Sequence, residues 1–332
     1  MKALMMKYLL LAAIGIAWSG SAVAQDKVIF SLNWIPAGNH YGVFAAKEQG
    51  FYKEANLDVD IQRGYGSGDT VKRIATGAAH MGIADATSVI VGRGNGLNVK
   101  QVAILFGRSA DAIFFIEGNK IAQPKDLEGR TLGGTTGETT LNLVPIFAKN
   151  AGIDASKIQI VNLTSSAKFS SLAGKSIDSI VGFVNEEPAI KAAAGNVGLK
   201  VGRFTFADYG IDYYSIGLIA SDDLIQKNPD LVRRLATATM KGYAWALKNR
   251  EAAADAFVKA LPENNRAVSL AQWDVARQLI TTDSALKNGL GWIEEGKMNQ
   301  TIALIRNFQK VDGALTAKDV YTMSFIPKIK ID

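Results

Sequence analysis

Apolar, often β-branched runs alternate with segments of helical period over the first third of the chain. The spacing of apolar residues predicts helices near 42–50 and 67–77. The runs typical of strands are 28–32, 57–61, 81–84 and 102–105. This alternation predicts an α/β unit with a largely parallel sheet.

A second set of strand-like runs begins at residue 112. Helices are predicted over 166–173 and 187–194, between and after the later runs. The strand-like runs of this set are 112–116, 131–134, 157–161 and 176–183. The middle third of the chain is therefore expected to form an α/β unit of its own.

From residue 215 onward the pattern becomes almost wholly helical, after one strand-like run at 215–221. Asn228 is a good N-cap residue and Pro229 suits the first position of a helix. An apolar stripe recurs at helical spacing from Leu231 to Ala246. Further helices are predicted over 251–261, 269–281 and 294–308.

One strand is too few for a third sheet, so the helical part is expected to pack back onto the first unit. The sequence thus predicts a two-lobed α/β fold in which each lobe is a mixed sheet flanked by helices. Lobe 1 would consist of 25–110 and 214–332, and lobe 2 of 111–213. Two crossings between the lobes, near 108–112 and 210–215, would form a hinge that closes a cleft around a ligand.

Residues 1–24 have the pattern of a secretory signal peptide. Lys2 and Lys7 precede an apolar run from Tyr8 to Trp18, and Ala22-Val23-Ala24 suits cleavage. The apolar run is shorter than the roughly 20 residues that a membrane-spanning helix needs. The chain has no cysteine, which excludes disulfides and a lipid anchor on cysteine. We therefore expect a free, monomeric periplasmic protein.

Charge and composition narrow the function further. The formal charge is +6, or +4 without residues 1–24, and basic residues are interleaved with acids, so nucleic acid is not an expected partner. The two histidines, His40 and His80, and the lack of cysteine exclude a Cys/His zinc site and a three-histidine site. No GxSxG motif occurs, and GGTTGETT lacks the GK[ST] ending of a P-loop. We expect neither catalysis nor a bound metal or cofactor.

Two small-residue turns, GYGSGD (64–69) and GGTTGETT (133–140), join strands to helices. In the first, Tyr65 and Ser67 could contact a ligand, or the segment could be an ordinary glycine turn. In the second, free backbone N–H groups and the hydroxyls of Thr135, Thr136 and Thr139 suit an anion or a polar acceptor. Alternatively, these threonines only cap the next helix.

Carboxylates follow one strand in each unit, at the edge where open α/β sheets bind ligands. Asp85 comes directly after the run 81–84 and could accept a hydrogen bond from a ligand amine or cap the next helix. Asn185, Glu186 and Glu187 follow the run 176–183 and could accept from ligand N–H groups, or the carboxylates could complement the helix dipole.

The segment NWIPAGNHYG (33–42) crowds aromatic residues, proline and histidine into the first strand-to-helix connection. A catalytic role lacks partners, because the chain offers no nucleophile, metal set or second useful histidine. We predict that this loop forms one wall of a ligand cleft, with Trp34 and His40 facing the ligand.

The segment NWIPAGNHYGVFAAKEQGFYKEANLDVDI resembles the opening of the thiamine-pyrimidine family of substrate-binding proteins, relatives of the nitrate, sulfonate and taurine binders. The matching features are the Asn-Trp pair, Pro36, His40, Gly42, the run GFYKE (50–54) and LDV (57–59). MGIAD, KDLEGRTLG, GFVNEEP and NPDLVRRLATATMKGYAWAL match further family segments. The likeness therefore covers essentially all residues after the predicted signal peptide.

This resemblance implies a type II periplasmic binding protein that delivers a small ligand to the permease and ATPase of an ABC importer at the inner membrane. It also implies ligand contacts from the turns described above and from a tyrosine near the second crossing. The implied contact residues are Trp34, His40, Tyr65, Ser67, Asp85, Thr135, Thr136, Glu138, Asn185, Glu187 and Tyr213.

The same superfamily contains a eukaryotic pyrimidine synthase, which is the enzyme alternative. That branch carries a cysteine cluster for iron, and a lysine and a histidine where this chain has Ala84 and Ser88. For the ligand, we favour an aromatic heterocycle such as a thiamine pyrimidine precursor over a nitrate-, sulfonate- or taurine-type anion. Burying an anion against Asp85, Glu186 and Glu187 would be costly without matching cations.

Overall fold

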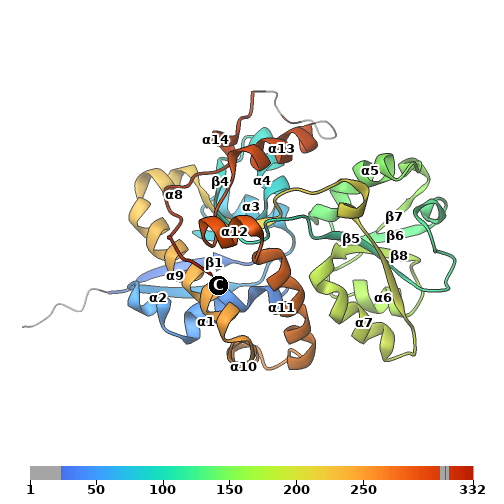
Figure 1. The fold of residues 1–332 in the computed structure, drawn as a ribbon, viewed down its shortest axis with the longest axis horizontal. Coiled ribbons are helices and arrows are strands. Elements are labelled where there is room, and N and C mark those ends of the chain that lie inside the picture. Colours follow the sequence, from blue (N-terminus) through green and yellow to red (C-terminus); the bar gives the residue numbers. More distant parts are fainter. Residues whose placement is uncertain (1–23, 307–310, 312–313, 332) are drawn as a thin grey trace, which may run out of the picture.

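The computed structural model describes residues 24–306, 311 and 314–331, so the predicted signal peptide lies outside the described residues apart from Ala24. The described chain forms two lobes that lie side by side (Figure 1). Each lobe contains a mixed five-stranded sheet. The predicted two-lobed α/β architecture is confirmed, and the residue boundaries of the lobes stay a prediction.

The first sheet has the strand order β2-β1-β3-β10-β4. Strand β1 runs parallel to β2 and β3, whereas β10 runs antiparallel to β3 and β4. Its strands are β1 (Asp26–Ser31), β2 (Leu57–Gln62), β3 (Met81–Asp85), β4 (Val99–Ile104) and β10 (Ile216–Ser221). The helices between them are α1 (Tyr41–Glu48), α2 (Phe51–Glu54), α3 (Ser67–Ala75) and α4 (Ala86–Gly94), with the 3-10 helix η1 (Gly38–His40) before α1.

The second sheet has the order β7-β6-β8-β5-β9. Its strands are β5 (Asp111–Ile116), β6 (Thr131–Gly134), β7 (Gln159–Asn162), β8 (Ser179–Phe183) and β9 (Val201–Thr205). The helices are α5 (Thr139–Asn150), α6 (Lys168–Ala173) and α7 (Glu187–Gly195), with 3-10 helices η2 (Pro124–Leu127), η3 (Ala155–Lys157), η4 (Val184–Glu186) and η5 (Phe206–Tyr209). Strand β9 was not predicted, because Gly202 and Arg203 interrupt its apolar pattern at the sheet edge.

Each sheet contains one antiparallel strand, and it is the strand by which the chain enters from the other lobe. Strand β5 follows β4, and β10 follows β9. A strand that comes directly from the hinge starts at the edge of the sheet that faces the other lobe. Its neighbours end at that edge, so the strand runs antiparallel to them. The carboxyl ends of β3, β6 and β8 are thereby gathered along the cleft between the lobes.

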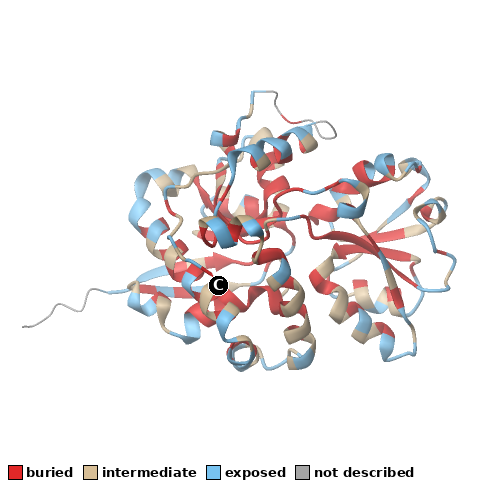
Figure 2. Ribbon diagram, viewed as in Figure 1, coloured by how far each residue is buried: buried red, intermediate tan, exposed pale blue. Residues whose placement is uncertain are grey.

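The helical C-terminal part packs on lobe 1, as predicted. Helices α9, α10 and α11 contribute to one buried core with α1 and the first sheet, and Trp273 lies fully buried in that core. Figure 2 shows the buried strands between exposed outer helix faces. These helices are α8 (Asp222–Lys227), α9 (Pro229–Lys248), α10 (Arg250–Ala260), α11 (Arg266–Ile280), α12 (Asp283–Asn288), α13 (Glu295–Arg306) and α14 (Ala317–Val320).

Two local predictions for this part are also met. Asn228 caps α9, since its side chain accepts a hydrogen bond from the Leu231 amide at 3.1 Å, and Pro229 is the first residue of the helix.

None of the helices within the described ranges has the length and apolar character needed to cross a bilayer.

Candidate functional site

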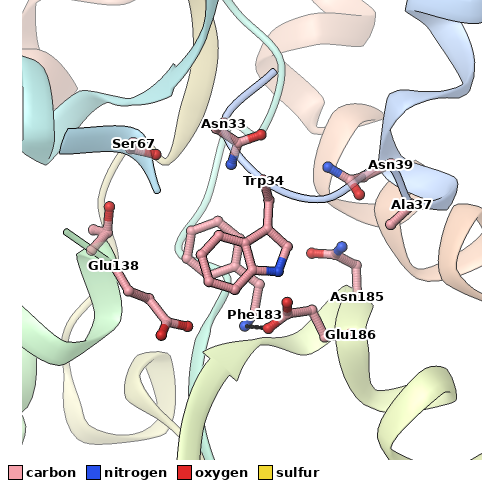
Figure 3. Close-up of a pocket in the computed structure, with 10 residues that line it drawn as sticks. Asn33, Trp34, Ala37, Asn39, Ser67, Glu138, Phe183, Asn185 and Glu186 are labelled. Atoms are coloured by element: carbon pink, nitrogen blue, oxygen red, sulfur yellow. Dashed lines mark hydrogen bonds between the residues drawn. The ribbon is translucent and has the colours of Figure 1, made fainter. Parts of the chain in front are cut away.

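A cavity that is partly open to solvent lies between the lobes. Lobe 1 contributes the loop after β1 and the start of α3, and lobe 2 contributes the β6–α5 turn and the end of β8 with η4 (Figure 3). Its lining residues are Asn33, Trp34, Ala37, Asn39, Ser67, Glu138, Thr139, Phe183, Asn185 and Glu186. The cavity therefore combines aromatic, amide and carboxylate groups from both lobes.

Two aromatic rings, one from each lobe, face this cavity. Trp34 follows β1 and Phe183 ends β8, and Figure 3 draws both side chains at its centre. The indole Nε1 of Trp34 and the Oδ1 of Asn185 are buried and have no hydrogen-bond partner among the described residues. Because an unpaired buried polar atom costs about 1 to 3 kcal/mol, this donor and this acceptor are suited to a ligand that satisfies both.

His40 does not line the cavity but orients a residue that does. The backbone N–H of Ala37 donates to Nδ1 of His40 at 3.1 Å, so the ring proton sits on Nε2 and is donated to Oδ1 of Asn33 at 3.0 Å. This bond leaves the amide nitrogen of Asn33 on the cavity side (Figure 3). Complete burial lowers the pKa of His40 to about 3, so the ring stays neutral at physiological pH.

A buried ion cluster forms the lobe 2 side of the site. Lys168, the first residue of α6, is fully buried and donates from Nζ to Oε1 of Glu138. The same Nζ lies 3.8 Å from Oε2 of Glu186 and 4.9 Å from the centroid of the Trp34 ring. Buried charges of this kind require paired partners, and here two carboxylates share one ammonium group.

The charge of this cluster limits what the cavity can hold. The pKa of Lys168 is raised, because its two carboxylate neighbours outweigh the effect of burial, so the lysine keeps its proton. Burial raises the pKa of Glu138 to about 7, the Glu186 carboxylate adds to the rise, and Lys168 opposes it. The one ammonium group is shared between two carboxyl groups, so the cluster offers no free cation with which to hold an anion.

Four of the predicted contact residues lie in the cavity wall: Trp34, Ser67, Glu138 and Asn185. Ser67 is the first residue of α3, and its Oγ accepts from the Asp85 amide at 3.0 Å. Asn185 belongs to η4, which carries it from the end of β8 into the cleft. The strand-to-helix turns thus converge as their place at strand ends suggests.

Asp85 and Tyr213 lie instead at the hinge, where they serve buried polar networks. Asp85 caps α4 by accepting from the amide and hydroxyl of Thr87 at 2.9 and 2.7 Å, and it also accepts from the Ser215 hydroxyl at 2.7 Å. The Tyr213 hydroxyl donates to Asp111, the first residue of β5. Both side chains are engaged away from the cavity, so the capping alternative for Asp85 describes the structure.

The remaining predicted residues also lie outside the lining set. Tyr65 is 55% exposed with the guanidinium of Arg63 over its ring at 4.5 Å. Thr136 donates from its amide and hydroxyl to Oδ1 of Asn162, and the amide of Thr135 donates to Glu138 Oε2 at 2.9 Å. Thr135 thereby orients a residue of the cavity.

Glu187 was predicted to contact the ligand, but it is not among the residues that line the cavity. The neighbouring Glu186 lines the cavity in its place. Glu187 begins α7 and forms ion pairs with Lys191, at 3.0 Å, and with Arg203 on β9. Its carboxylate is therefore neutralised by basic side chains of lobe 2. The sequence offered both carboxylates side by side and carried no local signal that distinguished them.

Lys168, Phe183 and Asn33 were not predicted as site residues. Lys168 stands in the ordinary segment SSAKFSS, and its importance comes from Glu138 and Glu186, which are distant in sequence. Phe183 could have been suspected from its place at the end of a strand, directly before Asn185. Within the described ranges, no group of three or more His, Cys, Asp and Glu side chains could hold a metal ion.

The lobes also touch directly across the cleft. The Gly68 amide lies 3.3 Å from the Gly137 carbonyl oxygen, and the Ser88 and Thr139 hydroxyls are 3.0 Å apart. Helix α11 of the first lobe contacts η4 and α7 of the second. This arrangement is a closed one, in which the cavity is walled from both sides.

Solved structures with the same arrangement show which fold the chain has. The chain has a TM-score of 0.64 to the periplasmic aliphatic sulphonate binding protein SsuA from Escherichia coli, with 15% identity over 92% of this chain and 94% of that one. The score is 0.68 to the periplasmic nitrate-binding protein NrtA from Synechocystis PCC 6803, with 11% identity over 92% and 87% of the chains. The fold is therefore that of the two-lobed periplasmic binding proteins, as predicted.

Sequence similarity narrows this class to one family. A family model described as NMT1/THI5 like matches residues 37–253, and the chain belongs to this family. It is 26% identical to the formylaminopyrimidine-binding protein of Halalkalibacterium halodurans over 79% of each chain. It is 25% identical to the riboflavin-binding protein RibY of Chloroflexus aurantiacus, over 91% of this chain and 86% of that one. It is also 25% identical, over 76% of each chain, to the 4-amino-5-hydroxymethyl-2-methylpyrimidine phosphate synthase THI13 of Saccharomyces cerevisiae.

Proposed function

We propose that this protein is the extracytoplasmic binding component of an ABC importer and that it captures a small, planar nitrogen heterocycle such as an aminopyrimidine. The observation that carries this proposal is the unpaired donor of Trp34 and the unpaired acceptor of Asn185 in a cavity with aromatic walls. A nitrogen heterocycle with an amino group offers one acceptor, one donor and a flat face for stacking. Binding proteins for a pyrimidine and for riboflavin among the relatives support this ligand class.

An anion such as nitrate or a sulfonate is the second candidate, on the strength of the fold alone. The charge of the cavity argues against it, because Lys168 is shared between Glu138 and Glu186. An anion placed against these carboxylates would lose its hydration without gaining a free cation.

A synthase function is the third candidate, because relatives of that activity have similar sequences. The chain has no cysteine for an iron cluster, and it has Ala84 and Ser88 where we expect the lysine and histidine of that branch. A binding protein that does not transform its ligand agrees better with these residues than a synthase does.

Titration calorimetry of residues 25–332 tests the ligand class directly. The probes are 4-amino-5-hydroxymethyl-2-methylpyrimidine, riboflavin, methanesulfonate and nitrate. We expect the aminopyrimidine to bind, and to raise the midpoint of thermal unfolding because it binds only the folded state. Binding of methanesulfonate or nitrate with no response to either heterocycle would refute the proposal.

Trp34→Ala tests whether stacking contributes to the binding. Loss of one aromatic face is expected to weaken binding of the aminopyrimidine by about 1 to 3 kcal/mol, the scale of base stacking on aromatic side chains. Trp292→Ala is a matched control, since Trp292 is 39% exposed and is not among the cavity-lining residues. Equal affinity of the two variants would assign Trp34 to packing alone.

A further inference from the structure

The buried ammonium group of Lys168 stands behind the cavity rather than in its wall. The charged groups that face it are Glu138, from the β6–α5 turn, and Glu186, from η4. On its remaining side the Trp34 ring of the opposite lobe covers it, with 4.9 Å between Nζ and the ring centroid. The ammonium group is therefore enclosed by two carboxyl groups and an aromatic ring and is removed from water.

The neighbouring carboxylate Glu187 is not part of this cluster. Glu187 lies on α7, which packs against α6, but its oxygens are paired with Lys191 and Arg203. The balance of charge behind the cavity is thus set by one lysine and two glutamates.

The two glutamates differ in how completely they are satisfied. Glu138 accepts from Lys168 at Oε1 and from the Thr135 amide, at 2.9 Å, at Oε2. Glu186 accepts from the Phe183 amide at 3.0 Å, and its contact with Lys168 is longer than a hydrogen bond, at 3.8 Å. Oε1 of Glu186 is left without a partner among the described residues, and Glu186 lines the cavity.

We propose that Lys168 is a specificity-determining residue: by pairing with Glu138 it leaves the Glu186 carboxylate free to bind a ligand group that donates a hydrogen bond or carries positive charge. The cleft then selects amines and rejects anions. This inference rests on the proposed function and names the groups that enforce it.

The physical reason is that two carboxylates in one buried site cannot both ionise without a cation between them. In the absence of Lys168 they would share one proton, as paired carboxylates do. Loss of the lysine would therefore weaken Glu186 as an acceptor for a ligand amine. The lysine therefore acts on the ligand through Glu186 and not by contact.

Calorimetric titration of residues 25–332 with 4-aminopyrimidine and with methanesulfonate, at several pH values from about 6 to 9, tests this assignment. Lys168→Met is expected to weaken binding of 4-aminopyrimidine about tenfold at neutral pH, the scale of a lost charged hydrogen bond. Relative to the wild type, the loss should shrink as the pH rises and both carboxylates ionise. Lys168→Arg retains the charge and should recover most of the affinity.

The double variant Glu138→Gln/Glu186→Gln tests the same idea without removing the lysine, in case Lys168→Met does not fold. It leaves Lys168 as an unpaired cation, so it should lose 4-aminopyrimidine and gain methanesulfonate, most strongly at the lowest pH. If Lys168→Met folds and binds 4-aminopyrimidine as tightly as the wild type at every pH, the role of Lys168 is refuted and the proposed function stands. If the wild type itself binds methanesulfonate and binds neither 4-aminopyrimidine, 4-amino-5-hydroxymethyl-2-methylpyrimidine nor riboflavin, both are refuted.

Discussion

The buried carboxyl group of Asp85 makes the stability of this protein depend on pH in a predictable direction. Asp85 is fully buried at the hinge, where it accepts hydrogen bonds from Thr87 and Ser215. Burial raises the pKa of Asp85 from 3.8 to about 7, and the nearby Asp111 carboxylate adds to the rise, against these hydrogen bonds. The folded chain therefore holds this proton more tightly than the unfolded chain does.

The sign and size of the effect follow from linkage. Since the folded pKa lies above the unfolded one, the contribution to stability is fully present below about pH 4 and is lost as the pH rises through about 7. With these two pKa values, the free energy of unfolding should fall by about 2 to 3 kcal/mol between pH 5 and pH 8 on account of Asp85.

Urea unfolding of the wild type and of Asp85→Asn at about pH 5 and pH 8 measures this contribution. The asparagine has no charge to titrate and keeps an acceptor oxygen for the Thr87 amide. Comparing the two proteins at each pH largely cancels groups that titrate in both. Asp58→Asn, on the exposed face of β2, is the matched control and should follow the wild type. If Asp85→Asn shows the same fall between the two pH values as the wild type, Asp85 is ionised in the fold and the reasoning fails.

Two further predictions concern closure and the support of the cavity. Gly66 has φ +123°, and a Cβ there would lie 2.7 Å from the Gly137 carbonyl oxygen across the cleft, so Gly66→Ala should hinder closure and weaken ligand binding. Small-angle scattering with ligand would reveal the wider shape, whereas Gly195→Ala, with open space around its Cβ, should leave it unchanged. His40→Asn, which loses the Nε2 donor to Asn33, should weaken ligand binding by about 1 kcal/mol. Calorimetry should show the same difference in binding free energy between His40→Asn and the wild type at every pH from about 5 to 8. The pKa of His40 is about 3, so its ring does not change charge in this range.

Local pattern was sufficient for most of the secondary structure. The run 131–134 coincides with β6, and Asn228 with Pro229 marked the start of α9, because capping and apolar periodicity depend on near neighbours in the chain. Strand β9 was not predicted, because this partly buried edge strand lacks a regular apolar periodicity. The predicted helix near 42–50 ends at Glu48, and Gly50 adopts a positive φ before α2 begins.

The candidate site was predictable only to the level of turns. The ends of β1, β6 and β8 were expected to meet, and they do, but the choice of side chains within each turn depended on packing. Asp85 faces the hinge because its oxygens cap α4 and meet Ser215 from the second crossing.

The sequence by itself determined the alternation of strands and helices and the return of the helical part to lobe 1. These features depend on local periodicity and on composition. Only the tertiary structure decided that Glu186 rather than Glu187 faces the cavity, and that Lys168 lies between Glu138 and Glu186. The reason is physical. The charge of a buried cavity is set by groups that the fold brings together from separate turns, and the local sequence of one turn does not show which other turns will pack against it.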